Sequence, residues 1–267
     1  MKTISSRHNA LFKRVLRAID EHKDEIAIEG PKAVEDAIAN GWKPIVMIYR
    51  EGEFPSPGLR PPSPRKRGEG TSESPRPAER GEGGRRPGEG LSLVITQPLF
   101  DALADTRTSQ GIIALFERPR FDDIFKDKIV VALDGVQDPG NVGTIVRLAA
   151  AFDCGGVVLL PGSADAYGPK AIRASAGAIL TVPVVNMTRD QLIARDWPLF
   201  AADANGKAID PPSRRAVIIF GSEGSGVSSE IAGRATRMAI PMSNRVESLN
   251  VATSAAILLA RTYAKRS

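Results

Sequence analysis

Short apolar runs alternate with stretches of helical character along the second half of the chain. Runs with almost no polar residue are typical of parallel strands that are covered on both faces. The expected strands are residues 129–133, 156–160, 199–202, 217–220 and 238–240, and the expected helices are 142–151 and 170–180. Alternating elements of this kind predict an α/β fold, in which ligands bind at the carboxyl ends of the strands.

A smaller α/β pattern occupies residues 1–116. Residues 9–19 alternate basic and apolar positions at helical spacing, and residues 31–39 form a second helical stretch that begins with a proline and is followed by a glycine. The other elements expected here are strands at 45–49, 91–95 and 111–116 and a short helix at 101–104. Residues 117–127 are expected to be the linker to a second domain, residues 128–267.

Residues 51–90 differ in composition from everything around them. This stretch holds eight Pro and nine Gly in forty residues, and Phe54 is its single aromatic residue. Such a segment cannot bury enough apolar surface to offset its ordering entropy. It is therefore predicted to be a low-complexity, disordered insertion in a surface loop of the N-terminal domain. The alternative is an arm that touches RNA through its arginine clusters.

The bulk composition allows a sizeable core and favours a polyanionic partner. The 267 residues are 42% hydrophobic, and the net charge is +5. One cysteine, Cys154, and two histidines, His8 and His22, cannot form a disulfide framework or a Cys/His zinc site within one chain, so no metal is expected. The N-terminus lacks an apolar signal core, and no run approaches the ~18 apolar residues of a membrane span. A cytoplasmic protein with no membrane partner is therefore expected.

Three polar or glycine-rich loops follow predicted strands. In the first, residues 133–147, Gly140 and Gly143 are expected to let the backbone approach a ligand closely. This loop has neither the G-x-G-x-x-G fingerprint of dinucleotide sites nor a Walker lysine. Arg147 follows Asn141 by about 1.7 helical turns. Taken alone, it is an ordinary exposed helix arginine.

The second and third loops add polar side chains at two further strand ends. Residues 218–228 place Glu223 among three glycines. In residues 246–254, VESLNVATS, Ser248 is expected to cap the following helix, which leaves Glu247 and Asn250 unexplained. Together the three loops contain no metal ligands, no catalytic triad and no P-loop. A site built mostly of backbone groups suits a neutral or zwitterionic organic cofactor better than a triphosphate.

The same loops resemble the motifs of a known family. The segments DPGNVGTIVRLAAAF (138–152), IIFGSEGSGVS (218–228) and IPMSNRVESLNVATSAAILLA (240–260) resemble, in this order, the three motifs of the SpoU (TrmH) family of RNA ribose 2'-O-methyltransferases, which belongs to the SPOUT superfamily. EIAIEGPKAVEDAI (25–38) and ADTRTSQGIIALF (104–116) resemble the family's N-terminal substrate-binding domain. The resemblance covers nearly the whole chain except residues 51–90.

This resemblance implies a C-terminal, trefoil-knotted α/β methyltransferase domain and a small N-terminal α/β domain that is ribosomal-protein-like and binds RNA. It also implies S-adenosyl-L-methionine as cofactor and a homodimer with active sites near the dimer interface. Because of the separate N-terminal domain, ribosomal RNA is favoured as substrate over transfer RNA. Two alternatives remain: a transfer-RNA 2'-O-methyltransferase, and a catalytically silent RNA-binding or ribosome-assembly protein on the same scaffold.

Motif matching also implies roles for individual residues. The family's catalytic or structural polar positions correspond to Asn141, Arg147, Glu223, Ser248 and Asn250. The positions whose backbone contacts the cofactor correspond to Gly221, Ile240 and Leu249. Asn141 and Ser248 are expected to fix geometry, and Glu223 to hold Asn141 or Arg147. A guanidinium keeps its proton near neutral pH. Arg147 is therefore expected to activate the ribose hydroxyl electrostatically and to anchor the adjoining phosphate rather than to act as a base.

Two more basic residues are candidates for RNA-backbone contacts. Lys170 and Arg173 lie in the segment between the first two motifs, YGPKAIRASAGAILTVPV (167–184), which also resembles the family. Ordinary surface solvation is the alternative for both side chains.

Overall fold

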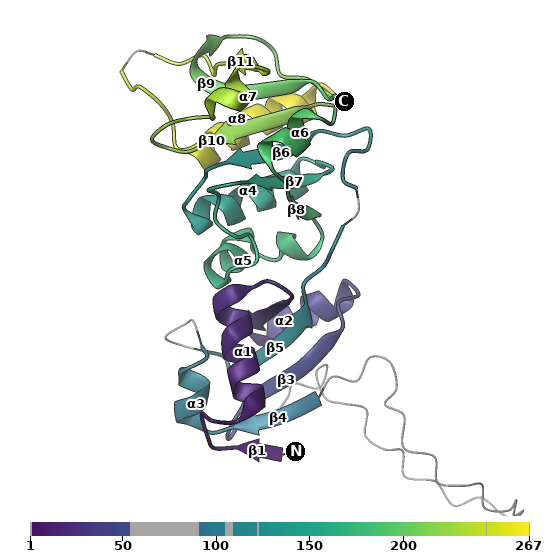
Figure 1. Ribbon diagram of the computed structural model, residues 1–267, viewed down its shortest axis with the longest axis vertical. Coiled ribbons are helices and arrows are strands. Elements are labelled where there is room, and N and C mark those ends of the chain that lie inside the picture. Colours follow the sequence, from purple (N-terminus) through teal and green to yellow (C-terminus); the bar gives the residue numbers. More distant parts are fainter. Residues whose placement is uncertain (1, 54–90, 105–108, 122, 244, 267) are drawn as a thin grey trace, which may run out of the picture. The chain divides into compact units, whose positions relative to one another are not determined.

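A computed structural model describes residues 2–53, 91–104, 109–121, 123–243 and 245–266 (Figure 1). The chain divides into two compact units, Met1–Leu16 with Ala27–Glu117 and Arg17–Ile26 with Arg118–Ser267. Most of the predicted insertion, from residue 54 to residue 90, lies outside the described residues. The predicted domain limits stay predictions.

The first unit is built on a five-stranded sheet with the order β1-β4-β3-β5-β2. The strands of this sheet are β1 (Lys2–Ile4), β2 (Glu25–Glu29), β3 (Pro44–Arg50), β4 (Leu91–Ile95) and β5 (Ile112–Glu117), and the helices are α1 (Ala10–Glu21), α2 (Pro31–Ala39) and α3 (Gln97–Asp101). The division into units runs through α1 and β2, whose residues 17–21 and 25–26 belong to the second unit. Strand β3 pairs in parallel with β4 and antiparallel with β5. The three predicted strands and the first two predicted helices are confirmed. The third helix was expected at 101–104 but lies earlier, because Pro98 occupies its first turn after the N-cap Thr96.

The second unit is built on a six-stranded sheet with the order β11-β9-β10-β6-β7-β8. The strands are β6 (Val130–Asp134), β7 (Gly156–Leu160), β8 (Val184–Asn186), β9 (Leu199–Lys207), β10 (Val217–Gly221) and β11 (Thr236–Met238). All their pairings are parallel, which confirms the prediction from the apolar runs. The last strand was expected at 238–240. It lies two residues earlier, because Thr236 and Arg237 pair with Phe200 and Ala201 before the register shifts at Met238.

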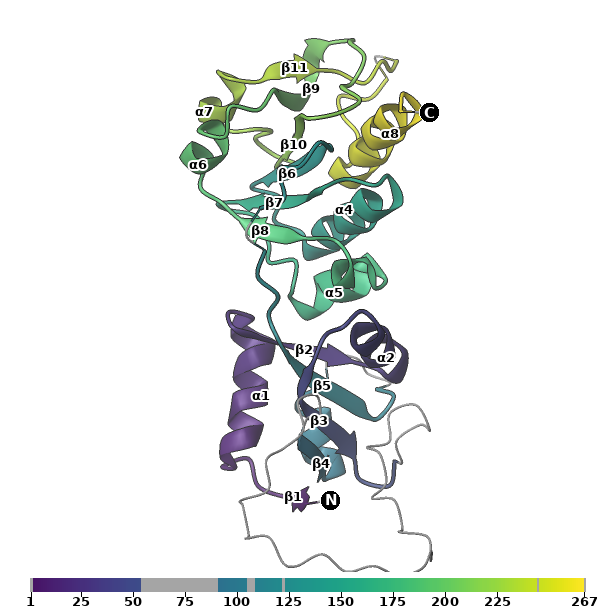
Figure 2. The same ribbon diagram turned by 90° about the vertical axis from the view of Figure 1, so that its right-hand side faces the viewer.

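Strands β6, β7 and β10 of this sheet are buried on both faces. The helices are α4 (Pro139–Ala151), α5 (Pro169–Ser175), α6 (Arg189–Ile193), α7 (Ser229–Ala232) and α8 (Val251–Ala264). Figure 2 shows α4, α5 and α8 on one side of the strands and α6 and α7 on the other. Val130, Ala132 and Ile219 pack with Leu192 of α6 and Ile231 of α7. The strand residues between them are buried as well, and they point to the opposite face, which explains why these runs contain no polar position.

The helix expected at 170–180 is interrupted. Helix α5 ends at Ser175, Ala176 and Gly177 adopt left-handed conformations with φ of 48° and 87°, and a 3-10 turn follows at Ala178–Leu180. The apolar spacing continues through the break, so the pattern alone predicts one helix. The structure therefore corrects the length of this helix but not its place in the chain.

Helices α4 and α5 approach so closely that Gly143 has no room for a side chain. A Cβ atom at Gly143 would lie 2.2 Å from the carbonyl oxygen of Ala171 and 2.7 Å from the Cβ of Ala174. The sequence suggested that Gly143 lets the backbone approach a ligand, and this interpretation is wrong. The glycine is buried, and it lets two helices pack together.

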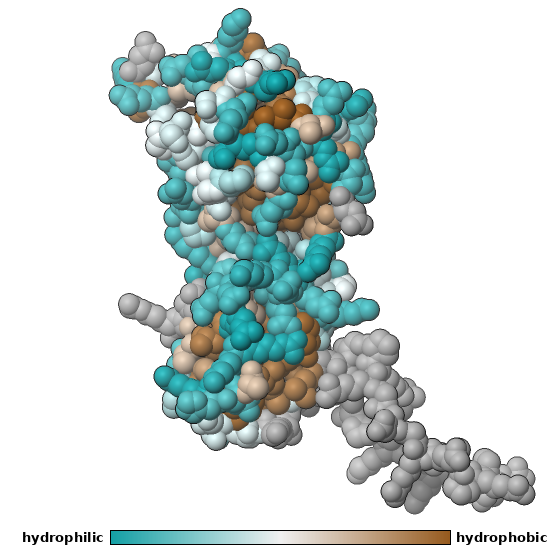
Figure 3. Space-filling view, in the orientation of Figure 1, coloured by the Kyte–Doolittle hydropathy of each residue, from teal (hydrophilic) through white to brown (hydrophobic). Residues whose placement is uncertain are grey.

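The surface in Figure 3 is largely hydrophilic, with hydrophobic patches on both units. Large apolar side chains that are exposed include Phe121, Met242, Val246 and Tyr263. Among the helices of the described residues, none has the length and apolar character needed to cross a membrane.

We expect the substitution Gly143→Ala to destabilise the protein by about 1–3 kcal/mol, because the added methyl group must displace backbone atoms of α5. A fall in melting temperature of several degrees in a thermal unfolding scan would report this loss. The matched control is Gly224→Ala, since a Cβ atom at Gly224 meets nothing within 4 Å. Equal melting temperatures for the two variants would contradict the packing argument.

Candidate active site

Three polar side chains from distant parts of the sequence form one hydrogen-bonded cluster. The Nδ2 of Asn141 donates to the Oε1 of Glu223 over 2.7 Å, and the Nδ2 of Asn250 donates to the Oδ1 of Asn141 over 3.3 Å. Asn141 lies in the first turn of α4, Glu223 in the loop after β10, and Asn250 immediately before α8. The cluster thus joins all three loops that the sequence singled out, and Glu223 holds Asn141 as expected.

The first turn of α4 is fixed by Asp138. Its Oδ1 accepts a hydrogen bond from the backbone N–H of Asn141 over 3.0 Å, so Asp138 is the N-cap of the helix. The Nζ of Lys170 donates to the Oδ2 of Asp138 over 2.9 Å. The hydrogen bond from Lys170 is the main cause that lowers the pKa of Asp138. Lys170, a candidate for RNA contact, is therefore already engaged by this carboxylate.

The N-cap of α8 is Asn250, and the expectation that Ser248 caps this helix is wrong. The Oδ1 of Asn250 accepts from the backbone N–H groups of Ala252 and Thr253 over 2.9 and 3.3 Å. An amide side chain carries both an acceptor and donors, so Asn250 caps the helix and still donates to Asn141. A serine in the cap position would not span both partners, and Ser248 lies exposed in the preceding loop.

The loop after β10 is a tight hairpin. Ser222 and Gly226 exchange two backbone hydrogen bonds of 3.0 Å, and the Oγ atoms of Ser222 and Ser225 lie 2.7 Å apart. A Cβ atom at Gly221 would lie within 2.3 Å of the backbone of Gly226 and Val227. Only glycine therefore allows this loop to fold back over its own strand, which places Glu223 at the tip.

A buried carboxylate that the sequence did not single out ties this loop to the sheet. Asp134 ends β6, and its side chain is 1% exposed. Its Oδ2 accepts from the backbone N–H of Ser228 over 2.8 Å, and its Oδ1 accepts from the Nε of Arg189 over 2.9 Å. A buried charge requires such partners. The signal in the sequence is a single acidic residue that ends an otherwise apolar strand.

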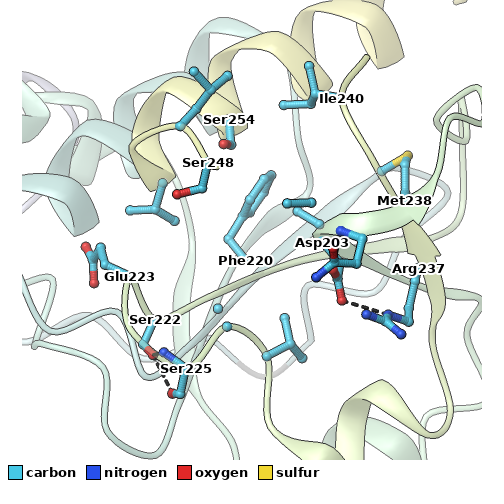
Figure 4. Close-up of a pocket in the computed structure, with 18 of the residues that line it drawn as sticks. Asp203, Phe220, Ser222, Glu223, Ser225, Arg237, Met238, Ile240, Ser248 and Ser254 are labelled. Carbon is cyan, nitrogen blue, oxygen red and sulfur yellow. Dashed lines mark hydrogen bonds and ion pairs between the residues drawn. The ribbon is translucent and has the colours of Figure 1, made fainter. Parts of the chain in front are cut away.

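A cavity of about 710 Å³ lies beside the cluster. Its walls come from β9, β10 with its hairpin, β11 and the segment that leads into α8, and they include Gly221, Glu223, Ile240, Ser248 and Leu249 (Figure 4). All three residues expected to contact the cofactor thus line one cavity, together with two of the expected catalytic residues. A volume of this size lies within the ~300–1,000 Å³ typical of small-molecule sites.

The other expected site residues lie outside the cavity wall. Asn141 and Asn250 belong to the adjoining cluster, whereas Arg147 and Arg173 are exposed on α4 and α5. Arg147 makes no hydrogen bond or ion pair with Asn141, Glu223 or Asn250. Glu247, which the sequence left unexplained, is part of the cavity wall. The sequence gave no reason to consider Asp203 and Arg237, which line the cavity as well.

We expect Asn250→Ala to lower the free energy of unfolding by about 0.5–2 kcal/mol, because the cap of α8 is lost. Ser248→Ala is the matched control and should change this free energy by less than ~0.5 kcal/mol, since Ser248 is exposed and caps nothing. Urea denaturation of both variants would compare them. A loss for Ser248→Ala as large as that for Asn250→Ala would show that Ser248 is the cap.

Comparison with known proteins places the chain among RNA methyltransferases of one family. The SpoU rRNA Methylase family matches residues 128–260. The chain is 34% identical over 174 residues to the 23S rRNA (guanosine(2553)-2'-O)-methyltransferase RlmP of Bacillus subtilis, an alignment that covers 62% of this chain and 70% of the relative. It is 42% identical over 182 residues to the 23S rRNA (adenosine(1067)-2'-O)-methyltransferase of Streptomyces laurentii, covering 64% and 67%.

A solved structure shares the fold along the whole length. The AdoMet-bound rRNA methyltransferase from Sinorhizobium meliloti superposes with a TM-score of 0.76 at 24% identity, covering 99% of this chain and 98% of that chain. The α/β fold with a parallel sheet, expected from the sequence, is confirmed. The trefoil knot that the resemblance implied stays a prediction. By its motifs, its fold and its relatives, the chain belongs to the SpoU rRNA Methylase family.

Proposed function

We propose that this protein transfers a methyl group from S-adenosyl-L-methionine to a ribose 2'-hydroxyl of ribosomal RNA. The observation that carries this proposal is the joining of the three motif loops into one cluster, Asn141–Glu223–Asn250, beside a cavity of about 710 Å³. The two curated relatives described above are 23S rRNA 2'-O-methyltransferases, which favours ribosomal over transfer RNA.

The cavity has the chemistry to hold this cofactor. Ile240 and Leu249 supply apolar surface for a nucleobase, and the glycine-rich hairpin supplies backbone groups. Gly221, Ile240 and Leu249 are the residues we propose for the backbone contacts to the cofactor. When bound, the cofactor supplies an activated methyl group on a sulfonium.

The protein's own residues must then position and activate a weak nucleophile. A protonated ribose hydroxyl reacts poorly near neutral pH, so alignment and stabilisation of negative charge on oxygen are the available effects. Asn141 and Ser248 are proposed to align the hydroxyl, with Glu223 holding Asn141 through the 2.7 Å hydrogen bond.

Arg147 is proposed to supply the positive charge. It is exposed on α4, where RNA can reach it, and a guanidinium can grip a phosphate with two hydrogen bonds. Lys170 and Arg173 are proposed to add contacts to the RNA backbone from α5. For Lys170 this requires that the phosphate compete with Asp138, at 2.9 Å in the present structure.

The oligomeric state and the location are further parts of the proposal. Family membership supports a homodimer with active sites near the interface, and the named relatives support action in the cytoplasm. The competing function is a catalytically silent RNA-binding or ribosome-assembly protein. Calorimetric titration with S-adenosyl-L-methionine separates the two, because a silent binder need not take up the cofactor.

We expect Arg147→Ala to lower kcat by about 100-fold or more, because one charge contact in the transition state is lost, while the Kd for the cofactor stays near that of the unaltered protein. Methylation of ribosomal RNA with labelled cofactor would measure this. Arg234→Ala is the control, since Arg234 is an exposed arginine away from the cavity wall. An unchanged kcat for Arg147→Ala would remove Arg147 from the mechanism.

A further inference from the structure

An ion pair forms part of the cavity wall on strands β9 and β11. The Nε of Arg237 donates to the Oδ2 of Asp203 over 2.7 Å, and the backbone N–H of Asn205 donates to the Oδ1 of Asp203 over 2.8 Å. Asp203, Asn205 and Arg237 all line the same cavity. No motif discussed above includes Asp203 or Arg237, and the mechanism assigns them no part.

This pair lies away from the reacting end of the cavity. In Figure 4, Glu223 and Ser248 lie on one side, Asp203 and Arg237 lie on the other, and Phe220 lies between them. The methyl group must face the Asn141–Glu223–Asn250 cluster to reach a ribose hydroxyl of the RNA. The sulfur that carries it therefore belongs near Glu223 and Ser248, and the rest of the cofactor extends away from them.

Of the two arms on the sulfur, the adenosine fits the side of the ion pair better. Phe220, Met238 and Ile240 line this region. Phe220 and Met238 are almost fully buried, so Ile240 is the one of the three with apolar surface that a flat base can contact. The charge of Asp203 is largely balanced by Arg237, so the pair has little attraction for an ammonium group as such. A hydroxyl donor needs only an acceptor, and Asp203 is an acceptor in any orientation.

The carboxylate of Asp203 has capacity for further hydrogen bonds. An ionised carboxylate offers about four lone-pair positions, and Arg237 and Asn205 use two of them. The side chain is 27% exposed, so a ligand in the cavity can reach it. The hydrogen bond from Arg237 is the main cause that lowers the pKa of Asp203, which keeps the group ionised near neutral pH.

We propose that Asp203 accepts a hydrogen bond from one of the two ribose hydroxyls of the bound nucleoside cofactor, and that Arg237 is a positioning residue that holds the carboxylate in place. An acidic side chain also binds a ribose hydroxyl in dinucleotide sites. The chemistry proposed for Asp203, which lies within β9, is the same on a different scaffold. This proposal rests on the proposed function, because it assumes that the cavity takes up an adenosine.

The test is calorimetric binding of four ligands to the unaltered protein and to Asp203→Asn. The ligands are S-adenosylhomocysteine, 5'-methylthioadenosine, and the 2'-deoxy and 3'-deoxy forms of 5'-methylthioadenosine. We expect Asp203→Asn to raise the Kd of the two ligands with intact ribose by about 10-fold, because the acceptor loses its charge and one of its two oxygens. At least one deoxy ligand should bind both proteins with Kd values within about 2-fold, since it lacks the donor that Asp203 binds.

Two further variants separate this role from a general loss of structure. Asp210→Asn removes another carboxylate that is paired with basic residues, Arg261 and Lys265, but lies outside the cavity wall, and should leave every Kd unchanged. Arg237→Lys keeps a positive charge near Asp203 and should raise the Kd of intact-ribose ligands less than Asp203→Asn does. Melting temperatures of all variants would verify that they are folded.

Each contrary result has a distinct meaning. An unchanged Kd in Asp203→Asn, or an equal rise for intact and for both deoxy ligands, would overturn the proposal while the proposed function stands. A rise for S-adenosylhomocysteine but not for 5'-methylthioadenosine would also overturn it, because Asp203 would then bind the amino-acid arm. If the unaltered protein binds none of the four ligands, the proposed function fails together with this proposal.

Discussion

The carboxylate of Asp134 sits at the carboxyl end of a central strand, and two separate segments donate hydrogen bonds to it. One is Arg189 in α6, and the other is the backbone of Ser228, where the hairpin after β10 ends and α7 begins. A buried carboxylate that lost one of these partners would stay desolvated with only the other to offset the cost, and breaking a buried pair of this kind typically costs several kcal/mol. The hairpin is therefore held at both of its ends, by β10 on one side and by Asp134 on the other. Glu223, and through it Asn141, depends on that attachment.

The parallel sheet explains how much of this fold the sequence predicts. Strands buried on both faces must be apolar throughout, so their runs stand out, and the carboxyl ends of parallel strands must share one edge. Features that depend on contacts between distant segments could not be read in the same way. The break at Ala176–Gly177 interrupts a continuous apolar spacing. Gly143 looks like a ligand-binding glycine until α5 is placed against it.

The candidate site, like the fold, could be predicted from the sequence only in part. The motif resemblance pointed to Asn141, Glu223 and Asn250 on three separate loops, and the structure shows that Asn141 is hydrogen-bonded to the other two. The cap was expected at Ser248, but capping preference does not separate Ser248 from Asn250, because serine and asparagine are about equally good caps. The choice depends on where α8 begins, which the structure shows. Asp203 and Arg237 are 34 positions apart in the sequence, and no periodic pattern connects them. Their pairing follows from the adjacency of β9 and β11, which local sequence patterns do not reveal.

The amide of Asn250 has two ends with different partners. Its oxygen accepts from the first N–H groups of α8, and its nitrogen donates to Asn141. Rotating the amide by half a turn would satisfy neither partner, so one torsion angle serves both the helix start and the contact to Asn141. Fraying of the first turn of α8 would break that contact and leave Asn141 with Glu223 alone. A substitution that changes the stability of this helix end therefore also changes the hydrogen bonds of the cluster.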